Sequence, residues 1–124
     1  MDEASMNRIL AFLIFFTFHG ALLASPSCPP SDVKALDFAV KKYTPKKIIF
    51  FASWCKNCKD HLTNANLSSS IFVAAFDERT RAENVMNAFF KDNDTVICLW
   101  DAEQTIVKKY KVKGLPFEVD IVSN

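Results

Sequence analysis

Histidine is scarce in this 124-residue chain, which contains only His19 and His61. A protein zinc site needs four ligands, and only His61 lies near the cysteine pair Cys55 and Cys58. Covalent haem needs a histidine directly after the second cysteine of such a pair, and Lys59 stands there. The sequence therefore disfavours both a metal site and a haem, and we expect no cofactor.

The chain also lacks an excess of charge of either sign, since 15 basic and 14 acidic side chains give a formal net charge of +1. Nucleic-acid binding needs a clustered basic face with groups that read or stack on bases. The lysine pairs at 41–42, 46–47 and 108–109 are more simply explained as solvated edges of helices and loops. We expect no nucleic-acid partner, and the length suits one small domain.

An apolar run from Ile9 to Leu23 follows Arg8 and is too short to span a bilayer comfortably. These flanks are typical of a secretory signal, so residues 1–24 are predicted to be a signal peptide. If that segment is not removed, residues 9–23 would tether the protein to a membrane. Residues 25–124 then form the folded domain, and four cysteines fit an oxidising compartment outside the cytoplasm.

Hydrophobic periodicity alternates between helical and strand patterns along residues 31–122. The first helix would be capped by Ser31 and would bury Val33, Leu36, Val40 and Tyr43. Such alternation predicts an α/β sandwich whose central strands pair in parallel. The predicted elements are helices over 31–43, from about 55 to 64–66, over 81–91 and over 102–110, and strands over 48–53, 71–76, 95–100 and 117–122.

Two cysteines lie three residues apart where an apolar strand is expected to become a helix. Cysteine reacts as the thiolate, which a helix N-terminus favours, so Cys55 is the predicted nucleophile. Cys58 would lie one turn deeper on the same face, close enough to bridge and shielded enough to attack second. Taken alone, this motif is also compatible with a structural disulfide or half of a zinc site.

The sequence Trp-Cys-Lys-Asn-Cys at residues 54–58 and the Gly-Leu-Pro at residues 114–116 together resemble the paired signature of the thioredoxin superfamily. The stretch from Asp101 to Pro116 is most similar to TlpA-type exported thiol–disulfide oxidoreductases. The resemblance spans about residues 47–122 and implies a thioredoxin-like three-layer α/β/α sandwich with an extra helix–strand insertion. It also implies a cis Pro116 that faces the disulfide, with the backbone of Leu115 pairing with substrate. We expect Trp54 to shield the disulfide and contact substrate.

The resemblance implies an enzyme that reduces disulfides of protein substrates through Cys55 and Cys58. Its partners would be protein substrates that carry disulfides or thiols and an unidentified thiol–disulfide electron donor. Its expected location is the periplasm, with anchoring to the inner membrane as an option, and cytochrome c maturation is one expected role. Two alternatives remain open, namely an oxidase that forms disulfides and a thioredoxin-fold binding module without turnover.

Three features depart from the family pattern. Ile49 stands where thioredoxin has a buried aspartate, which places the usual proton relay to Cys58 in doubt. The chain stops at Asn124, which predicts a truncated C-terminus without the family's closing strand and helix. The region before Ile48 reads as a helix where TlpA-type domains have a strand hairpin.

The remaining cysteines are Cys28 and Cys98, and the sequence leaves their state open. Cys98 lies inside an apolar run, so it is expected to be a small buried core residue. A bridge to Cys28 is the alternative, because the sequence does not show whether the two Cα atoms approach within reach.

Overall fold

The computed structural model describes residues 26–90 and 95–122 of the chain. The predicted signal peptide or anchor at 1–24, including the tether at 9–23, lies outside these residues. Within the described part, no helix is long and apolar enough to cross a bilayer. In chain order the elements are α2 (Val33–Tyr43), β1 (Lys47–Phe51), α3 (Cys58–Thr63), a short 3-10 helix η1 (Leu67–Ser69), β2 (Ser70–Ala74), α4 (Arg79–Phe89), β3 (Cys98–Trp100), α5 (Thr105–Lys109) and β4 (Phe117–Asp120).

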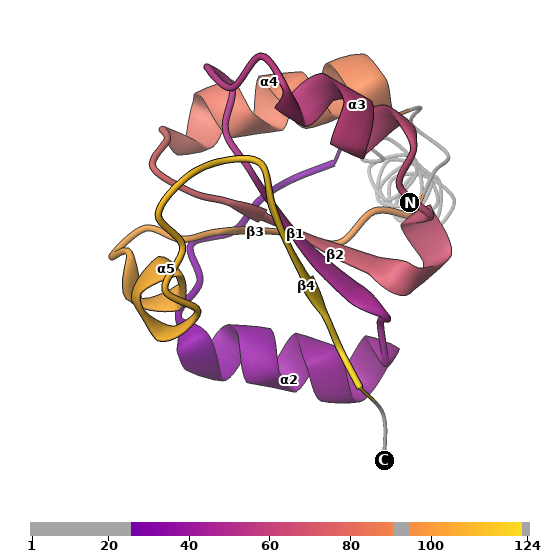
Figure 1. Cartoon of the computed structure of the whole chain (residues 1–124), viewed down its shortest axis with the longest axis vertical. Helices are drawn as coiled ribbons and strands as arrows, with labels where there is room; N and C mark the ends of the chain where they lie inside the picture. Colours follow the sequence, from indigo (N-terminus) through magenta and orange to yellow (C-terminus); the bar gives the residue numbers. More distant parts are fainter. Residues whose placement is uncertain (1–25, 91–94, 123–124) are drawn as a thin grey trace, which may run out of the picture.

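The strands form one four-stranded sheet in the order β3-β2-β1-β4, with helices on both faces (Figure 1). β1 pairs in parallel with β2, and β2 in parallel with β3, so the predicted parallel central pairing is confirmed. β4 pairs antiparallel to β1, with Phe117 opposite Phe50 and Asp120 opposite Lys47. The carboxyl end of β1 therefore lies beside the amino end of β4.

Two hydrophobic cores fill the space on either side of the sheet, because successive side chains of each buried strand point to opposite faces. In β1, Ile49 and Phe51 face one core and Ile48 and Phe50 face the other. The first core lies under α3 and α4, and the second lies under α2 and α5, as Figure 1 shows. The structure is thus a mixed α/β fold whose sheet is covered on both faces.

The cap of α2 differs from the prediction. Asp32 Oδ1 accepts a hydrogen bond from the Ala35 N–H at 2.9 Å, so Asp32 is the cap and the predicted Ser31 cap is wrong. The Ser31 hydroxyl instead donates to the Pro29 carbonyl at 2.9 Å. Its backbone N–H donates to the Trp100 carbonyl at 2.8 Å, which fixes Ser31 beside β3 and leaves the next residue to cap the helix.

The buried face of α2 is shorter than predicted. Leu36 and Ala39 are buried and Val33 and Val40 pack against the same core, as the helical period requires. Tyr43 remains 43% exposed, so its predicted burial is wrong. It is the last residue of the helix.

The strands β1 and β2 end at Phe51 and Ala74, earlier than predicted. Beyond Phe51, the chain turns so that the Ser53 N–H donates to Asp77 Oδ2 at 2.6 Å instead of continuing the ladder. After Ala74 the chain bends at Phe76, whose φ is 55°. The bonds between Ser53 and Asp77, which link residues 24 apart in sequence, hold the turn after β1 against the segment after β2.

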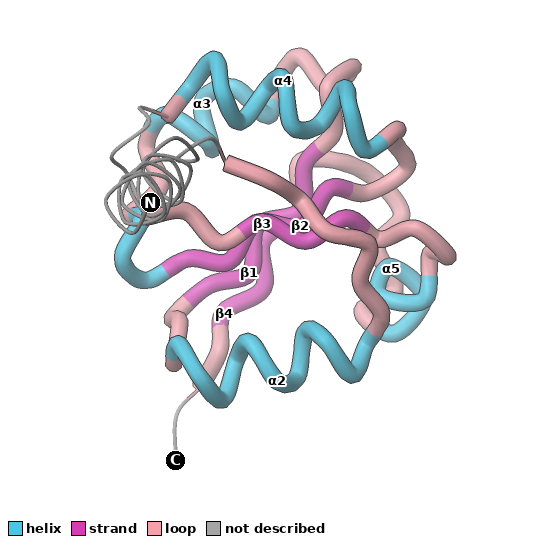
Figure 2. Tube along the Cα trace, turned by 180° about the vertical axis from the view of Figure 1, so that it is seen from behind, coloured by secondary structure: helices cyan, strands magenta, loops and turns pink. Residues whose placement is uncertain are grey.

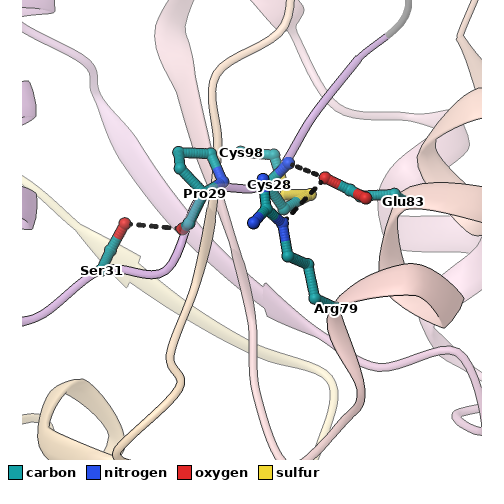
Figure 3. Close-up of a disulfide and its surroundings, with 6 residues drawn as sticks. All are labelled: Cys28, Pro29, Ser31, Arg79, Glu83 and Cys98. Atoms are coloured by element: carbon teal, nitrogen blue, oxygen red, sulfur yellow. Dashed lines mark hydrogen bonds and ion pairs between the residues drawn. A yellow bond between two sulfur atoms is a disulfide. The ribbon is translucent and has the colours of Figure 1, made fainter.

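A disulfide joins Cys28 to Cys98, with the two Cα atoms 4.7 Å apart. Both cysteines are buried, and the Cys28 N–H donates to Glu83 Oε2 at 2.8 Å, while Arg79 Nε donates to the same oxygen at 3.2 Å (Figure 3). The segment that carries Cys28 runs beside β3 before the chain enters α2, as Figure 2 shows. The bridge therefore attaches the N-terminal segment of the domain to the edge of the sheet.

Candidate functional site

The second disulfide joins Cys55 and Cys58 just beyond the carboxyl end of β1, with the two Cα atoms 5.4 Å apart. Its two members differ in accessibility, since Cys55 is 8% exposed and Cys58 is 1% exposed. An attacking or attacked sulfur must be reached from solvent, whereas a resolving sulfur need not be. Cys55 is thus the more accessible of the two residues, and the roles of nucleophile and resolving thiol stay a prediction.

The helix α3 begins at Cys58, so the prediction that it begins at about Cys55 is wrong. The Cys55 N–H donates to the Ala52 carbonyl at 3.2 Å, and the Cys58 N–H donates to the Cys55 carbonyl at 3.3 Å. These bonds form successive tight turns, with Cys55 before the first helical residue. The helix has only six residues, so its dipole supports a thiolate at Cys55 less than the prediction assumed.

The turn that carries Cys55 is fixed by the segment that follows β2. Asp77 accepts hydrogen bonds from the Ser53 N–H at 2.6 Å and from the Ser53 hydroxyl at 3.0 Å. Trp54 is 59% exposed, and its indole Nε1 donates to the Phe76 carbonyl at 2.9 Å. Trp54 therefore lies next to the cysteine pair with much of its ring exposed. The hydrogen bond from its indole nitrogen fixes its position.

The Gly-Leu-Pro turn reaches the same end of the sheet. Phe117 is the first residue of β4 and pairs with Phe50, so Leu115 and Pro116 continue past the carboxyl end of β1. The Leu115–Pro116 peptide bond is cis. Leu115 packs against the core cluster that contains Cys55 and Cys58. Residues 54, 55, 58, 115 and 116, singled out from the sequence, thus gather at one end of the sheet.

A hydrogen-bonded group of polar side chains connects α3 to β1 and β4 and was not predicted. Glu118 on β4 is opposite Ile49 of β1, and its Oε2 is bonded to His61 Nδ1. Its other oxygen accepts from Lys47 Nζ at 3.1 Å. The side chain of Glu118 is 26% exposed, and that of His61 is 37% exposed. A carboxylate therefore stands next to Ile49, on the neighbouring strand.

The environment of Glu118 changes its titration. Its partial burial alone would raise the pKa, but the hydrogen bonds from His61 and Lys47, together with their charges, bring the pKa below its ordinary value. The same ion pair raises the pKa of Lys47, first through the hydrogen bond and then through the charge of Glu118. Glu118 is therefore a carboxylate at neutral pH.

Below α3 there is a hollow of about 320 Å³ next to this charged group. Ile49 lines the hollow and also belongs to the core cluster that contains Cys58. A space of this size whose walls include several polar groups can hold water. Its lining residues are Lys46, Lys47, Ile49, His61, Asn64, Ala65, Asn66, Ser69, Ser70 and Glu118.

Within residues 26–90 and 95–122, no three side chains among histidine, cysteine, aspartate and glutamate gather closely enough to hold a metal ion.

A comparison with models of known protein families, with curated proteins and with solved structures finds no match to this chain. The geometry of the site is accordingly the main basis for assigning a function.

Sequence reasoning missed Glu118, Asp77 and the use of His61. Their partners are distant in the sequence, since Glu118 lies 57 residues from His61 and Asp77 lies 24 residues from Ser53. A partial signal was present, because Asp77 follows a buried strand and Glu118 is a charged residue inside an apolar strand pattern.

Replacing Glu118 by glutamine should lower the free energy of unfolding by about 0.5–1 kcal/mol at pH 7. The folded-state pKa of Glu118 lies below the unfolded value, so its contribution is full above the unfolded pKa and disappears as the pH falls through the folded one. Urea unfolding of both proteins should therefore differ at pH 7 and converge below about pH 4. A constant difference from pH 3 to pH 7 would contradict this account.

Proposed function

We propose that this protein is a thiol–disulfide oxidoreductase with a thioredoxin-like fold, which reduces disulfides of protein substrates through Cys55 and Cys58. The observation that carries the proposal is the closed Cys55–Cys58 bridge at the carboxyl end of β1, in which Cys55 is the more exposed residue. The sheet with helices on both faces and the Gly-Leu-Pro turn directly before β4 support the thioredoxin-like assignment.

The reaction uses the reduced dithiol. The Cys55 thiolate attacks one sulfur of a substrate disulfide, forms a mixed disulfide and releases the other substrate sulfur as a thiolate. Cys58 then attacks the Cys55 sulfur, which closes the bridge and releases the second substrate sulfur as a thiolate. Two electrons pass from the dithiol to the substrate, and a thiol–disulfide donor restores the dithiol.

The surface around Cys55 supports a polypeptide substrate. Trp54 is 59% exposed and Phe76, whose carbonyl binds the indole, is 38% exposed. Leu115 and Pro116 are half-buried at the same end of the sheet. Exposed aromatic and aliphatic side chains next to a reactive sulfur provide contact area for an apolar segment of another chain. In this proposal the three residues Trp54, Leu115 and Pro116 bind substrate.

The second disulfide supports an exported location. Cys28 is fully buried and Cys98 is 3% exposed, so their bridge is shielded from exchange. Buried structural disulfides persist mainly in proteins of oxidising compartments. We place the domain outside the cytoplasm, in the periplasm, with residues 9–23 as the export signal or tether.

Reduction of insulin, whose B chain precipitates when its disulfides are cleaved, tests this function. The reduced protein with dithiothreitol as donor should accelerate precipitation several-fold over dithiothreitol alone. A domain that instead oxidises reduced substrate and leaves insulin intact would be an oxidase. Absence of any thiol exchange by the folded domain would contradict the proposal and favour a binding module.

A further inference from the structure

One face of α2 combines an exposed aromatic ring with three lysines. Phe38 is 66% exposed and is the most exposed aromatic side chain of the described residues. Lys34 lies four residues before it, and Lys41 and Lys42 lie three and four residues after it. Residues at these spacings are neighbours on a helix surface, so the lysines flank the ring at both ends. All three lysines are exposed, and these four residues are called the exposed face of α2 below.

A groove of about 480 Å³ continues the apolar surface beside this face. Phe38 and Tyr43 line it on α2, and Val96 and Ile97 line it just before β3. A single exposed ring is ordinary on a protein surface, but here the apolar surface extends from the helix to the edge of the sheet. Tyr43 is 43% exposed, and tyrosine is a residue that favours the boundary between lipid and water.

The charges around the exposed face of α2 are mainly positive. Its three lysines form no ion pair with any other described residue. Two carboxylates lie nearby, but Asp37 is 3.3 Å from Lys109 Nζ, and Asp32 caps the start of the helix. Lysines next to exposed aromatic side chains on one amphipathic helix are typical of helices that lie on an anionic membrane surface.

The chain enters the described part of the structure next to the same groove. That part begins one residue before Ser27, and Ser27 lines the groove together with Phe38. The apolar run expected to be a signal or tether ends at Leu23, so a chain of at most about 14 Å joins it to Ser27. A bilayer that held residues 9–23 would therefore lie within reach of the exposed face of α2.

We propose that the exposed face of α2 binds the surface of an anionic phospholipid bilayer, with its lysines at the lipid phosphates and Phe38 inserted between the lipids. Each lysine close to such a surface strengthens binding about fivefold. α2 covers the face of the sheet opposite to α3, as Figure 1 shows. The cysteine pair therefore remains open to substrates while the domain lies on the membrane. The inference does not depend on thiol exchange.

Acetylation of lysine amines by a neutral succinimidyl ester measures this contact in the full chain. The protein is mixed with vesicles of phosphatidylcholine, or of phosphatidylcholine and phosphatidylglycerol in equal amounts. In dilute salt, Lys34, Lys41 and Lys42 should react at least about threefold more slowly on the anionic vesicles, as mass spectrometry of peptides reports. Lys56 and Lys113, exposed beside the cysteine pair and the Gly-Leu-Pro turn, are internal controls and should react equally on both. Concentrated sodium chloride should remove the difference, because it screens the lysines from the lipid phosphates.

The variant Phe38→Gln tests the apolar part of the contact. The ring is mostly outside the core, so the variant should fold normally by circular dichroism. The protection of the three lysines on anionic vesicles should nevertheless fall by about half or more, because the inserted ring is lost. The matched control is Phe76→Gln, which removes an exposed ring at the end of the sheet that carries the cysteine pair and should leave the protection unchanged.

A pair of double variants tests the charges. Replacing Lys41 and Lys42 by glutamine should weaken the protection of Lys34 on anionic vesicles, because two of the three contacts with lipid phosphates are lost. Replacing Lys56 and Lys59 by glutamine removes the same amount of charge from α3 and the turn before it. This second variant should protect Lys34 as well as the unmodified protein does.

Three results would overturn the proposal. The first is equal acetylation of the exposed face of α2 on both kinds of vesicle, or a decrease that Lys56 and Lys113 share. The second is protection that stays the same in Phe38→Gln and in the Lys41 and Lys42 variant, since closeness imposed by residues 9–23 would then explain it. The third is protection that appears without vesicles and grows with protein concentration, because a second copy of the chain would then cover this face.

Discussion

Replacing Cys55 by serine should abolish insulin reduction, lowering the rate by more than about 1000-fold toward the background. The hydroxyl of serine is far less nucleophilic than a thiolate, and Cys58 is too buried to replace it, being 1% exposed. The measurement is the rate of insulin reduction by the purified variant. Lys59→Gln, an exposed neighbour in α3, is the matched control and should retain activity within a few-fold.

Replacing Cys58 by serine should have a different result, because the first attack remains possible. The variant should accumulate as a mixed disulfide between Cys55 and its substrate, visible as a heavier band on a non-reducing gel and by mass spectrometry. Dithiothreitol should release it. Full activity of Cys55→Ser would contradict the assigned roles. So would a Cys55→Ser variant that accumulates as much mixed disulfide with substrate as Cys58→Ser does.

Removing the Cys28–Cys98 disulfide by replacing both cysteines with alanine should lower the free energy of unfolding by about 4 kcal/mol. The two cysteines are 70 residues apart, so the bridge restricts a large part of the unfolded chain. It also attaches the N-terminal segment to β3, where the backbone of Trp100 bonds to Pro29 and Ser31. Guanidinium unfolding followed by circular dichroism measures the loss.

The matched control for this prediction is the double alanine variant of Cys55 and Cys58. Its cysteines are only three residues apart, so removing that bridge should lower the free energy of unfolding by about 2 kcal/mol. A small domain is stable by only about 5–15 kcal/mol in total, so the first variant should be close to unfolding at 37 °C. A loss below about 1 kcal/mol for Cys28 and Cys98 would show that the bridge contributes little.

Most of the fold could be predicted from hydrophobic periodicity. Ile48 to Phe51 is apolar on both faces, which indicates a central strand covered by helices, and β1 is such a strand. The apolar period of α4 also agrees with its buried face, since Ala82 and Met86 are buried and Val85 packs against the same core. These features depend on neighbours in the sequence, and periodicity reports them directly.

Element boundaries were less predictable because they depend on bonds between distant segments. β1 ends at Phe51, just before Ser53 bonds to Asp77, and the first helix is capped by Asp32 while Ser31 is bonded to β3. Neither partner can be recognised from local sequence. The boundaries therefore shifted by one to three residues while the order of elements held.

In the candidate site, too, the features that depend on nearby residues could be predicted and those that depend on distant residues could not. The spacing of Cys55 and Cys58 predicted their bridge, whereas the pairing of His61 with Glu118 became visible only through the register that sets Glu118 opposite Ile49. A shift of one residue in that register would point the carboxylate to the other face of the sheet. Contacts between side chains on different strands can thus be identified from the structure and not from the local sequence pattern.

The central claim is that Cys55–Cys58 is a redox-active pair while Cys28–Cys98 is a structural bridge. Equilibration of the protein in dithiothreitol buffers of graded potential, with alkylation and mass spectrometry of each cysteine, tests it most directly. The account predicts a two-electron transition of Cys55 and Cys58 together at a potential nearer to about −270 mV than to about −120 mV, with Cys28 and Cys98 still oxidised at that midpoint. Reduction of Cys28 and Cys98 before Cys55 and Cys58 would contradict it.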